Sequence, residues 1–95
     1  MNTNLFPFED EKNTATLTCE CVFKYGQPIL YVCHDEDDGT WQFLCGKFHN
    51  ADEAMVVGLE SVYHHDPSIS TIAVLPLGYE AERENEKSDW KVQAK

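Results

Sequence analysis

Residues 28–46, PILYVCHDEDDGTWQFLCG, constrain the fold more than any other part of the chain, because two apolar runs flank one acidic turn. Residues 29–33 and 41–45 are rich in β-branched, aromatic and sulfur side chains, which pack well on a pleated surface. Asp38 and Gly39 supply the backbone freedom that a tight reversal needs. The segment therefore predicts a β-hairpin with strands at 28–35 and 40–46.

Residues 14–25 alternate in polarity with a period of two, which predicts a half-buried strand. We expect the buried face to carry Ala15, Leu17, Cys19, Cys21 and Phe23. The turn residues 26–28 then lead into the hairpin. Short connections favour antiparallel pairing, so we expect three consecutive antiparallel strands.

After Gly46 the pattern changes to a helical period, and Asn50 with Glu53 forms a capping box. The spacing predicts one main helix over 51–66. Its expected buried stripe is Ala51, Met55, Leu59, Val62 and Tyr63. Residues 67–74 predict one or two further helical turns, and residues 75–78 a reversal.

The last part of the chain alternates again, and residues 79–84 predict an edge strand with a row of carboxylates toward solvent. A short strand around 90–92 is expected to pair back as a final hairpin. The predicted fold class is α+β, a twisted antiparallel sheet with one main helix packed on one face. Residues 1–13 are expected to form a loose arm, and residues 14–95 a single domain.

The charge balance bears on the class of partner, since 17 acidic residues against 7 basic ones give a net charge of −10. Such a chain repels nucleic acid and anionic lipid and attracts basic surfaces. No apolar run is long enough to cross a membrane, and the N-terminal stretch is acidic where a secretory signal is basic. We therefore expect a cytoplasmic protein whose core needs no cofactor.

The candidate binding surface is acidic. It comprises Asp35, Glu36, Asp37, Asp38, Trp41, Glu80, Glu82 and Glu84. Residues 35–38 form either a solvated hairpin tip or a surface that docks a basic partner. A calcium loop is excluded, because the position that would need a glutamate is Cys45. Trp41 belongs either to the core or to the rim of an interface.

A second set of residues allows a different chemistry. Cys19, Cys21, Cys33, Cys45 and His49 are the candidate ligands of a zinc ion, or the parts of a thiol-dependent site. Their spacing does not match that of zinc knuckles, because Cys19 and Cys21 alternate within one predicted strand. Buried packing as thiols is the favoured interpretation. His64 and His65 suit the last turn of a helix, where cations are favourable.

The segment DDGTWQFLCG, followed by HHDPSISTIAVLPLGYEAER and Trp90, resembles a set of small bacterial domains of unknown function. These domains share a D-x-x-W-x-F-x-x-G segment and a later D-P-x-I…P-x-G-x-x-x-E-R segment. The matching positions are Asp38, Trp41, Phe43, Gly46, Asp66, Pro67, Ile69, Pro76, Gly78, Glu82 and Arg83. The resemblance covers roughly residues 28–90 and carries over no catalytic residue. Some members are suspected immunity proteins of polymorphic toxin systems, which implies binding to a toxin.

These observations together predict a non-enzymatic, acidic protein-binding module of the immunity-protein kind, with a basic protein such as a toxin nuclease as its partner. The alternative is a small zinc-binding or thiol-dependent protein that uses the cysteines and His49. A third possibility is a homo-oligomer that pairs through an exposed sheet edge.

Overall fold

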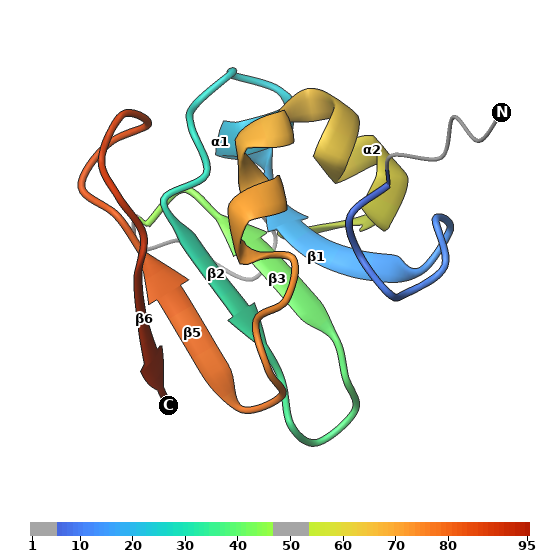
Figure 1. Cartoon of the computed structure of the whole chain (residues 1–95). Coiled ribbons are helices and arrows are strands. Elements are labelled where there is room, and N and C mark those ends of the chain that lie inside the picture. Colours follow the sequence, from blue (N-terminus) through green and yellow to red (C-terminus); the bar gives the residue numbers. More distant parts are fainter. Residues whose placement is uncertain (1–5, 47–53) are drawn as a thin grey trace, which may run out of the picture.

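The computed structural model describes residues 6–46 and 54–95. Its centre is a six-stranded mixed sheet with the order β4-β1-β3-β2-β5-β6 (Figure 1). The strands are β1 (Ala15–Cys19), β2 (Tyr31–His34), β3 (Trp41–Leu44), β4 (Ala54–Gly58), β5 (Tyr79–Glu82) and β6 (Lys91–Ala94). The helices are α1 (Glu20–Phe23), α2 (Leu59–His65) and the 3-10 helix η2 (Pro67–Ile72). The α+β class is therefore confirmed in its coarse form.

The predicted β2–β3 hairpin is confirmed. Its strands are antiparallel, with Tyr31 opposite Leu44 and His34 opposite Trp41. The acidic turn closes through hydrogen bonds from the Gly39 amide to the Asp35 carbonyl and from the Asp35 amide to the Thr40 carbonyl. Gly39 has a φ of 75°, a conformation that glycine adopts without strain.

The expected antiparallel order of the first three strands is wrong. β1 pairs in parallel with β3 and antiparallel with β4, so the sheet is mixed. The predicted strand 14–25 ends at Cys19, and α1 follows it directly. The connection between the parallel neighbours β1 and β3 runs through α1, the loop after it, β2 and the β2–β3 turn. The turn of α1 also places Val22 at 0% exposure in the core.

Over residues 15–18, β1 presents to the core the opposite face from the one expected. Thr16 and Thr18 are buried, whereas Ala15 is exposed and Leu17 is half-buried. Cys19, at the end of the strand, is buried in the core as expected. The Thr16 hydroxyl donates to the Val57 carbonyl at 2.9 Å, and the Thr18 hydroxyl donates to the Phe43 carbonyl at 2.6 Å. Burial of a hydroxyl costs little once it has such a partner, so the threonines can face inward.

The prediction of one main helix over 51–66 is wrong for residues 54–58. Ala54–Gly58 form β4, which pairs along its whole length with β1, and the helix runs only over Leu59–His65. The cross-strand partners favour the extended form for this stretch, which local helical spacing does not reveal. Asn50, Ala51 and Glu53 of the predicted helix start lie outside the described residues.

The C-terminal third follows the predicted order of elements. η2 occupies the expected helical stretch, and β5 and β6 form the expected last hairpin. β5 was expected at the edge but lies between β2 and β6, which leaves β6 as the edge strand. The addition of β6 therefore protects β5 from unpaired association.

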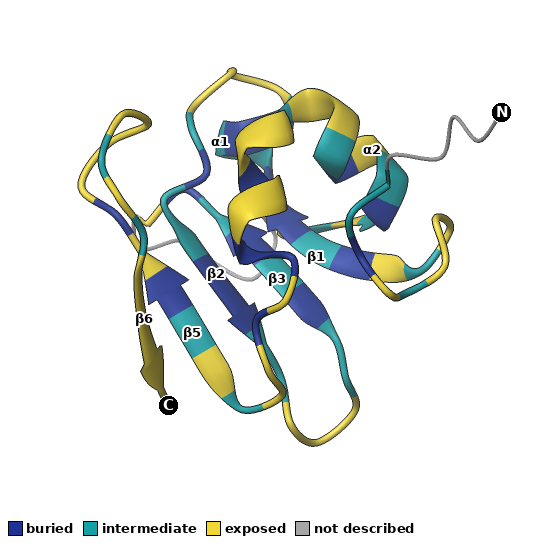
Figure 2. Ribbon diagram, viewed as in Figure 1, coloured by how far each residue is buried: buried dark blue, intermediate teal, exposed yellow. Residues whose placement is uncertain are grey.

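The core lies between one sheet face and the layer formed by α1, α2 and η2, and Figure 1 shows η2 and α2 in front of the sheet. Figure 2 shows buried residues running through the central strands, whereas β6 is exposed along its length. The largest buried side chains are Trp41, Phe43, Ile29, Leu59 and Ile69. Several short helices thus cover the face where one main helix was expected. Among the described residues no helix is long and apolar enough to cross a membrane.

Candidate functional site

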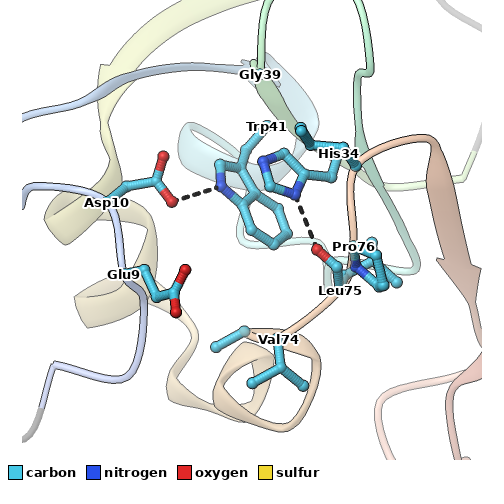
Figure 3. A pocket seen from close by; sticks show the side chains of 10 residues that line it. Glu9, Asp10, His34, Gly39, Trp41, Val74, Leu75 and Pro76 are labelled. Carbon is cyan, nitrogen blue, oxygen red and sulfur yellow. Dashed lines mark hydrogen bonds between the residues drawn. The ribbon is translucent and has the colours of Figure 1, made fainter.

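A cavity of about 510 Å³ opens at the end of the sheet where the β2–β3 turn lies. Its walls come from the N-terminal arm, from the hairpin and from the segment that joins η2 to β5. The lining residues are Glu9, Asp10, His34, Gly39, Trp41, Ala73, Val74, Leu75, Pro76 and Leu77. Figure 3 shows Glu9 and Asp10 on one side of this space, with Trp41 and His34 facing them and Val74 below.

The floor of the cavity is a stacked pair of rings. His34 and Trp41 are opposite each other in the hairpin, and their ring centroids lie 3.9 Å apart at an interplanar angle of 14°. His34 Nδ1 donates to the Leu75 carbonyl at 2.8 Å, and Trp41 Nε1 donates to Asp10 Oδ1 at 3.2 Å (Figure 3). These two hydrogen bonds join the hairpin to the arm and to the segment between η2 and β5. They fix the positions of the two rings in the floor.

The arm is held against this floor by its aromatic side chains. Phe8 is 5% exposed, and its ring meets Trp41 edge-on with centroids 5.0 Å apart. Edge-to-face contacts of this kind stabilise packing beyond simple burial. The described part of the predicted loose arm therefore packs on the domain and carries Glu9 and Asp10 to the cavity.

The rim of the cavity combines carboxylates with exposed apolar side chains. Val74 is 83% exposed and Leu77 is 53% exposed. Such exposure is unfavourable in isolation and is common where a partner docks. Glu36, Asp37 and Asp38 are exposed in the adjacent turn, and a Cβ added at Gly78, next to Leu77, would lie 3.3 Å from Glu36 Oε1.

Trp41, predicted either for the core or for an interface rim, is a core residue with 1% exposure. The predicted acidic residues fall into three places. The tip residues Glu36, Asp37 and Asp38 are exposed directly before Gly39, which lines the cavity, but they do not line it themselves. Asp35, Glu80 and Glu82 lie on the sheet face away from the helices, and Glu84 follows β5 at the end opposite the turn. Of the predicted site residues that the structure describes, Trp41 alone lines the cavity, and the tip lies next to it.

Asp35 and Glu80 are engaged within the molecule. Lys95 Nζ donates to Asp35 Oδ1 at 2.9 Å, and this contact lowers the pKa of Asp35 with help from Gln42. The Tyr31 hydroxyl donates to Glu80 Oε1 at 2.7 Å and lowers the pKa of Glu80. Burial, aided by Glu80, in turn raises the pKa of Tyr31. These carboxylates stabilise the β2–β5–β6 face and are less available to a partner than the tip.

The cysteines of the alternative site do not gather around one point. Cys19 and Cys45 lie in the core cluster and interact with each other, whereas Cys33 lies on the other face beside Asp35. Burial raises the pKa of Cys19 and Cys33, which keeps both protonated at neutral pH. Among residues 6–46 and 54–95 no group of three His, Cys, Asp or Glu side chains could hold a metal, and His49 lies outside those residues.

Arg83, which sequence reasoning noted only as a motif position, ties several elements together. It is 7% exposed, and its Nε donates to the Ile29 carbonyl at 3.0 Å. Its Nη2 reaches Asp66 Oδ2 at 3.4 Å and Ser68 Oγ at 3.2 Å, and its guanidinium lies 4.2 Å from the Trp90 ring centroid. The motif residues Asp66 and Arg83 therefore meet as a structural cluster, together with Trp90.

Glu9, Asp10 and His34 were missed as site residues. Glu9 and Asp10 belong to a segment without periodicity, and only the three-dimensional docking of Phe8 shows where they lie. His34 directly precedes the acidic run and could have been noticed for that reason. His64 and His65 do occupy the last turn of α2, where His65 stacks on Phe23 with centroids 4.7 Å apart.

Comparisons of this chain with protein-family models, curated proteins and solved structures gave no match.

Proposed function

We propose that this chain is a non-enzymatic protein-binding domain that docks a basic protein through the acidic end of its sheet. In this proposal it acts in a bacterial cytoplasm as an immunity-type protein that neutralises a toxin, as the family resemblance implies. Cys19 and Cys33 are thiols, which suits a reducing compartment. The observation that carries the proposal is the acidic rim around exposed Val74 and Leu77.

The distribution of charge supports a basic partner. Of the six basic side chains in the described part of the chain, four form ion pairs within the molecule, namely Lys12 with Glu60, Lys24 with Glu20, Arg83 with Asp66 and Lys95 with Asp35. The arm and the turn carry five exposed carboxylates, namely Glu9, Glu11, Glu36, Asp37 and Asp38. Such a field steers a basic protein toward this end and raises the association rate.

The chemistry of the cavity favours recognition over catalysis. His34 is held in a stack and donates through Nδ1 to a backbone carbonyl, which fixes the ring. The buried thiols Cys19 and Cys33 keep their protons because burial raises their pKa. An apolar centre with a polar rim is the usual arrangement of a protein interface.

The proposal is tested with two charge-reversal variants of equal size. Glu36→Lys with Asp37→Lys changes the rim, and Glu86→Lys with Asp89→Lys changes exposed positions in the loop between β5 and β6. Glu86 contacts Arg83 through its backbone carbonyl only, so this control leaves that contact in place. Tagged wild type and both variants are recovered from their own cells, and each retained protein is identified, purified and tested for direct binding.

We expect one basic protein to bind wild type and the Glu86/Asp89 variant directly, and to lose at least tenfold in affinity for the Glu36/Asp37 variant. Deletion of the gene should sensitise cells to that protein if the role is immunity. Equal binding of both variants, or no protein bound by wild type, would overturn the proposal. Self-association detected by light scattering would instead favour the homo-oligomer.

A further inference from the structure

We infer that the cavity between the arm and the β2–β3 turn receives a lysine or arginine side chain presented by the partner protein. This inference deepens the proposed function and rests on it. It names the chemical class of the group that enters the cavity. The overall charge alone predicts only that the partner is basic.

The apolar walls suit the aliphatic part of such a side chain. Val74, Pro76 and Leu77 line one side of the cavity, and the first and last of these are exposed by 83% and 53%. Lysine and arginine bury their methylene groups along apolar surface while the charged end reaches polar groups. A cavity of about 510 Å³ has room for one such chain together with water.

The carboxylates lie where the charged end would reach. Glu9 is exposed at the cavity wall, and Asp10 is oriented by the 3.2 Å bond from Trp41 Nε1 (Figure 3). An acceptor that is already held in place loses little entropy when a cation binds. A cation between the two carboxylates would form charge-assisted hydrogen bonds, which are stronger than neutral ones.

The floor argues against recognition of the cation by an aromatic face. One face of Trp41 stacks on His34 at 3.9 Å between centroids, and the ring of Phe43 stacks nearly parallel to Trp41 at 5.7 Å between centroids. Phe8 meets the same ring edge-on. Because these rings cover the faces of Trp41, Trp41 makes no cation–π contact and instead fixes the position of Asp10 through its N–H. Glu9 and Asp10 are therefore the groups that determine binding. A metal ion is a poor occupant, because the described residues provide no three-ligand cluster here.

The indole N–H of Trp41 offers a direct readout. Its ¹⁵N-¹H cross-peak reports the bond to Asp10, whereas the cross-peak of Trp90 serves as an internal control at the opposite side of η2. Trp90→Phe assigns the two peaks. The probes are the methylamides of Nα-acetyl-lysine, Nα-acetyl-arginine and the neutral Nα-acetyl-norleucine, and the diamine putrescine.

We expect the lysine and arginine probes to shift the Trp41 peak saturably with a Kd of roughly 1 mM, and norleucine to cause no saturable shift. Glu9→Gln should weaken binding about three- to fivefold, whereas Glu11→Gln, an exposed carboxylate outside the cavity, should leave it unchanged. Val74→Asn should weaken binding, and Val56→Asn on exposed β4 should not.

Three outcomes would overturn the inference: norleucine binding as well as lysine, Glu9→Gln binding like wild type, or the absence of a saturable shift. Tighter binding of putrescine than of the lysine probe would also count against a protein side chain. The two proposals are distinguished by their failures. A partner that binds wild type and Glu9→Gln equally contradicts the cavity as its binding site and leaves the proposed function standing. Probe binding without any protein partner contradicts the proposed function and the protein source of the side chain, and leaves only the cation preference of the cavity.

Discussion

At the residue scale, the side chains that matter most for this fold are polar groups buried with partners. Thr18 is fully buried, and its hydroxyl bonds the carbonyl of Phe43, its neighbour across the parallel β1–β3 pair. Arg83 plays the same role at the other end of the sheet, where it bonds a carbonyl of the loop before β2. A satisfied polar group in the core adds specificity, because any other register would leave it without a partner.

Thr18→Val keeps the shape of the side chain and removes the hydroxyl. We expect a loss of about 1 kcal/mol in the free energy of unfolding, measured by urea titration, because the buried hydrogen bond to Phe43 is removed. Thr71→Val is the matched control, since its hydroxyl bonds Ser68 on the exposed side of η2. A Thr18→Val protein as stable as wild type would show that this bond contributes nothing.

Arg83→Met removes the guanidinium but keeps an apolar stem against Trp90. We expect it to cost about 3 kcal/mol in the free energy of unfolding, since Asp66 and the Ile29 carbonyl lose a buried partner. Lys87→Met, in the exposed loop that follows, should change stability by less than about 0.5 kcal/mol. Equal effects of the two substitutions would mean that the Arg83 cluster is energetically neutral.

At the scale of elements, two glycines should respond in opposite ways to one substitution. Gly58 precedes α2 with a φ of −70°, and an added Cβ would lie 3.8 Å from the Lys12 carbonyl. Gly58→Ser should therefore stabilise by about 0.5 kcal/mol, because serine caps a helix well and restricts the unfolded chain. Gly78 has a φ of 82°, and an added Cβ would lie 3.3 Å from Glu36 Oε1.

Gly78→Ser should lower the free energy of unfolding by about 1 kcal/mol, because the positive φ of Gly78 is unfavourable for a residue with a Cβ. Thermal unfolding of the two variants side by side gives the sign directly, since each carries the same new side chain. A decrease in stability for both variants would show that the backbone ahead of α2 is less tolerant than its geometry indicates.

How well an element can be predicted depends on whether its determinants are local. The β2–β3 hairpin was predictable because its turn residues and both strands lie within 28–46. The buried face of β1 was not, because it depends on carbonyls of Phe43 and Val57 that accept the threonine hydroxyls. β4 was not predictable from local sequence, because its valines and methionine fit both a helical period and a strand period. Only the pairing with β1 selects the strand.

The candidate site shows the same limit. The acidic tip was identified from sequence because it is one continuous run. Its neighbours at the cavity were not, because Glu9 comes from the arm and Val74 from the segment after η2. Only the packing of Phe8 on Trp41 places them together.

At the scale of the whole molecule, the carboxylates of the β2–β5–β6 face make stability depend on pH. The pKa of Glu80 is lowered from its ordinary 4.5 in the folded state, chiefly by Tyr31 and then by Gln93. A group with a lowered folded pKa stabilises the protein above its unfolded pKa, and that contribution is lost as pH falls through the folded value. The same holds for Asp35, whose ordinary value is 3.8.

Tyr31→Phe isolates this effect from the repulsion among other acidic groups. We expect wild type to be more stable than the variant by a constant margin from about pH 4.5 up to the approach of the ordinary tyrosine pKa of 10.0, and this margin to shrink at lower pH. The carboxyl resonance of Glu80 should titrate at higher pH in the variant. Tyr25→Phe, at an exposed ring, should show neither change, and a pH-independent margin would contradict the role of Glu80.

The order of the sheet also has a consequence for synthesis on the ribosome. β2 needs β5 as its second neighbour, and β5 follows η2 along the chain, so the nascent chain carries the hairpin with one open edge until residues 79–82 have been synthesised. The sheet can therefore be completed only after β5 has emerged. Nascent chains arrested at residue 78 should be cleaved rapidly by added protease, and full-length released chains should resist it.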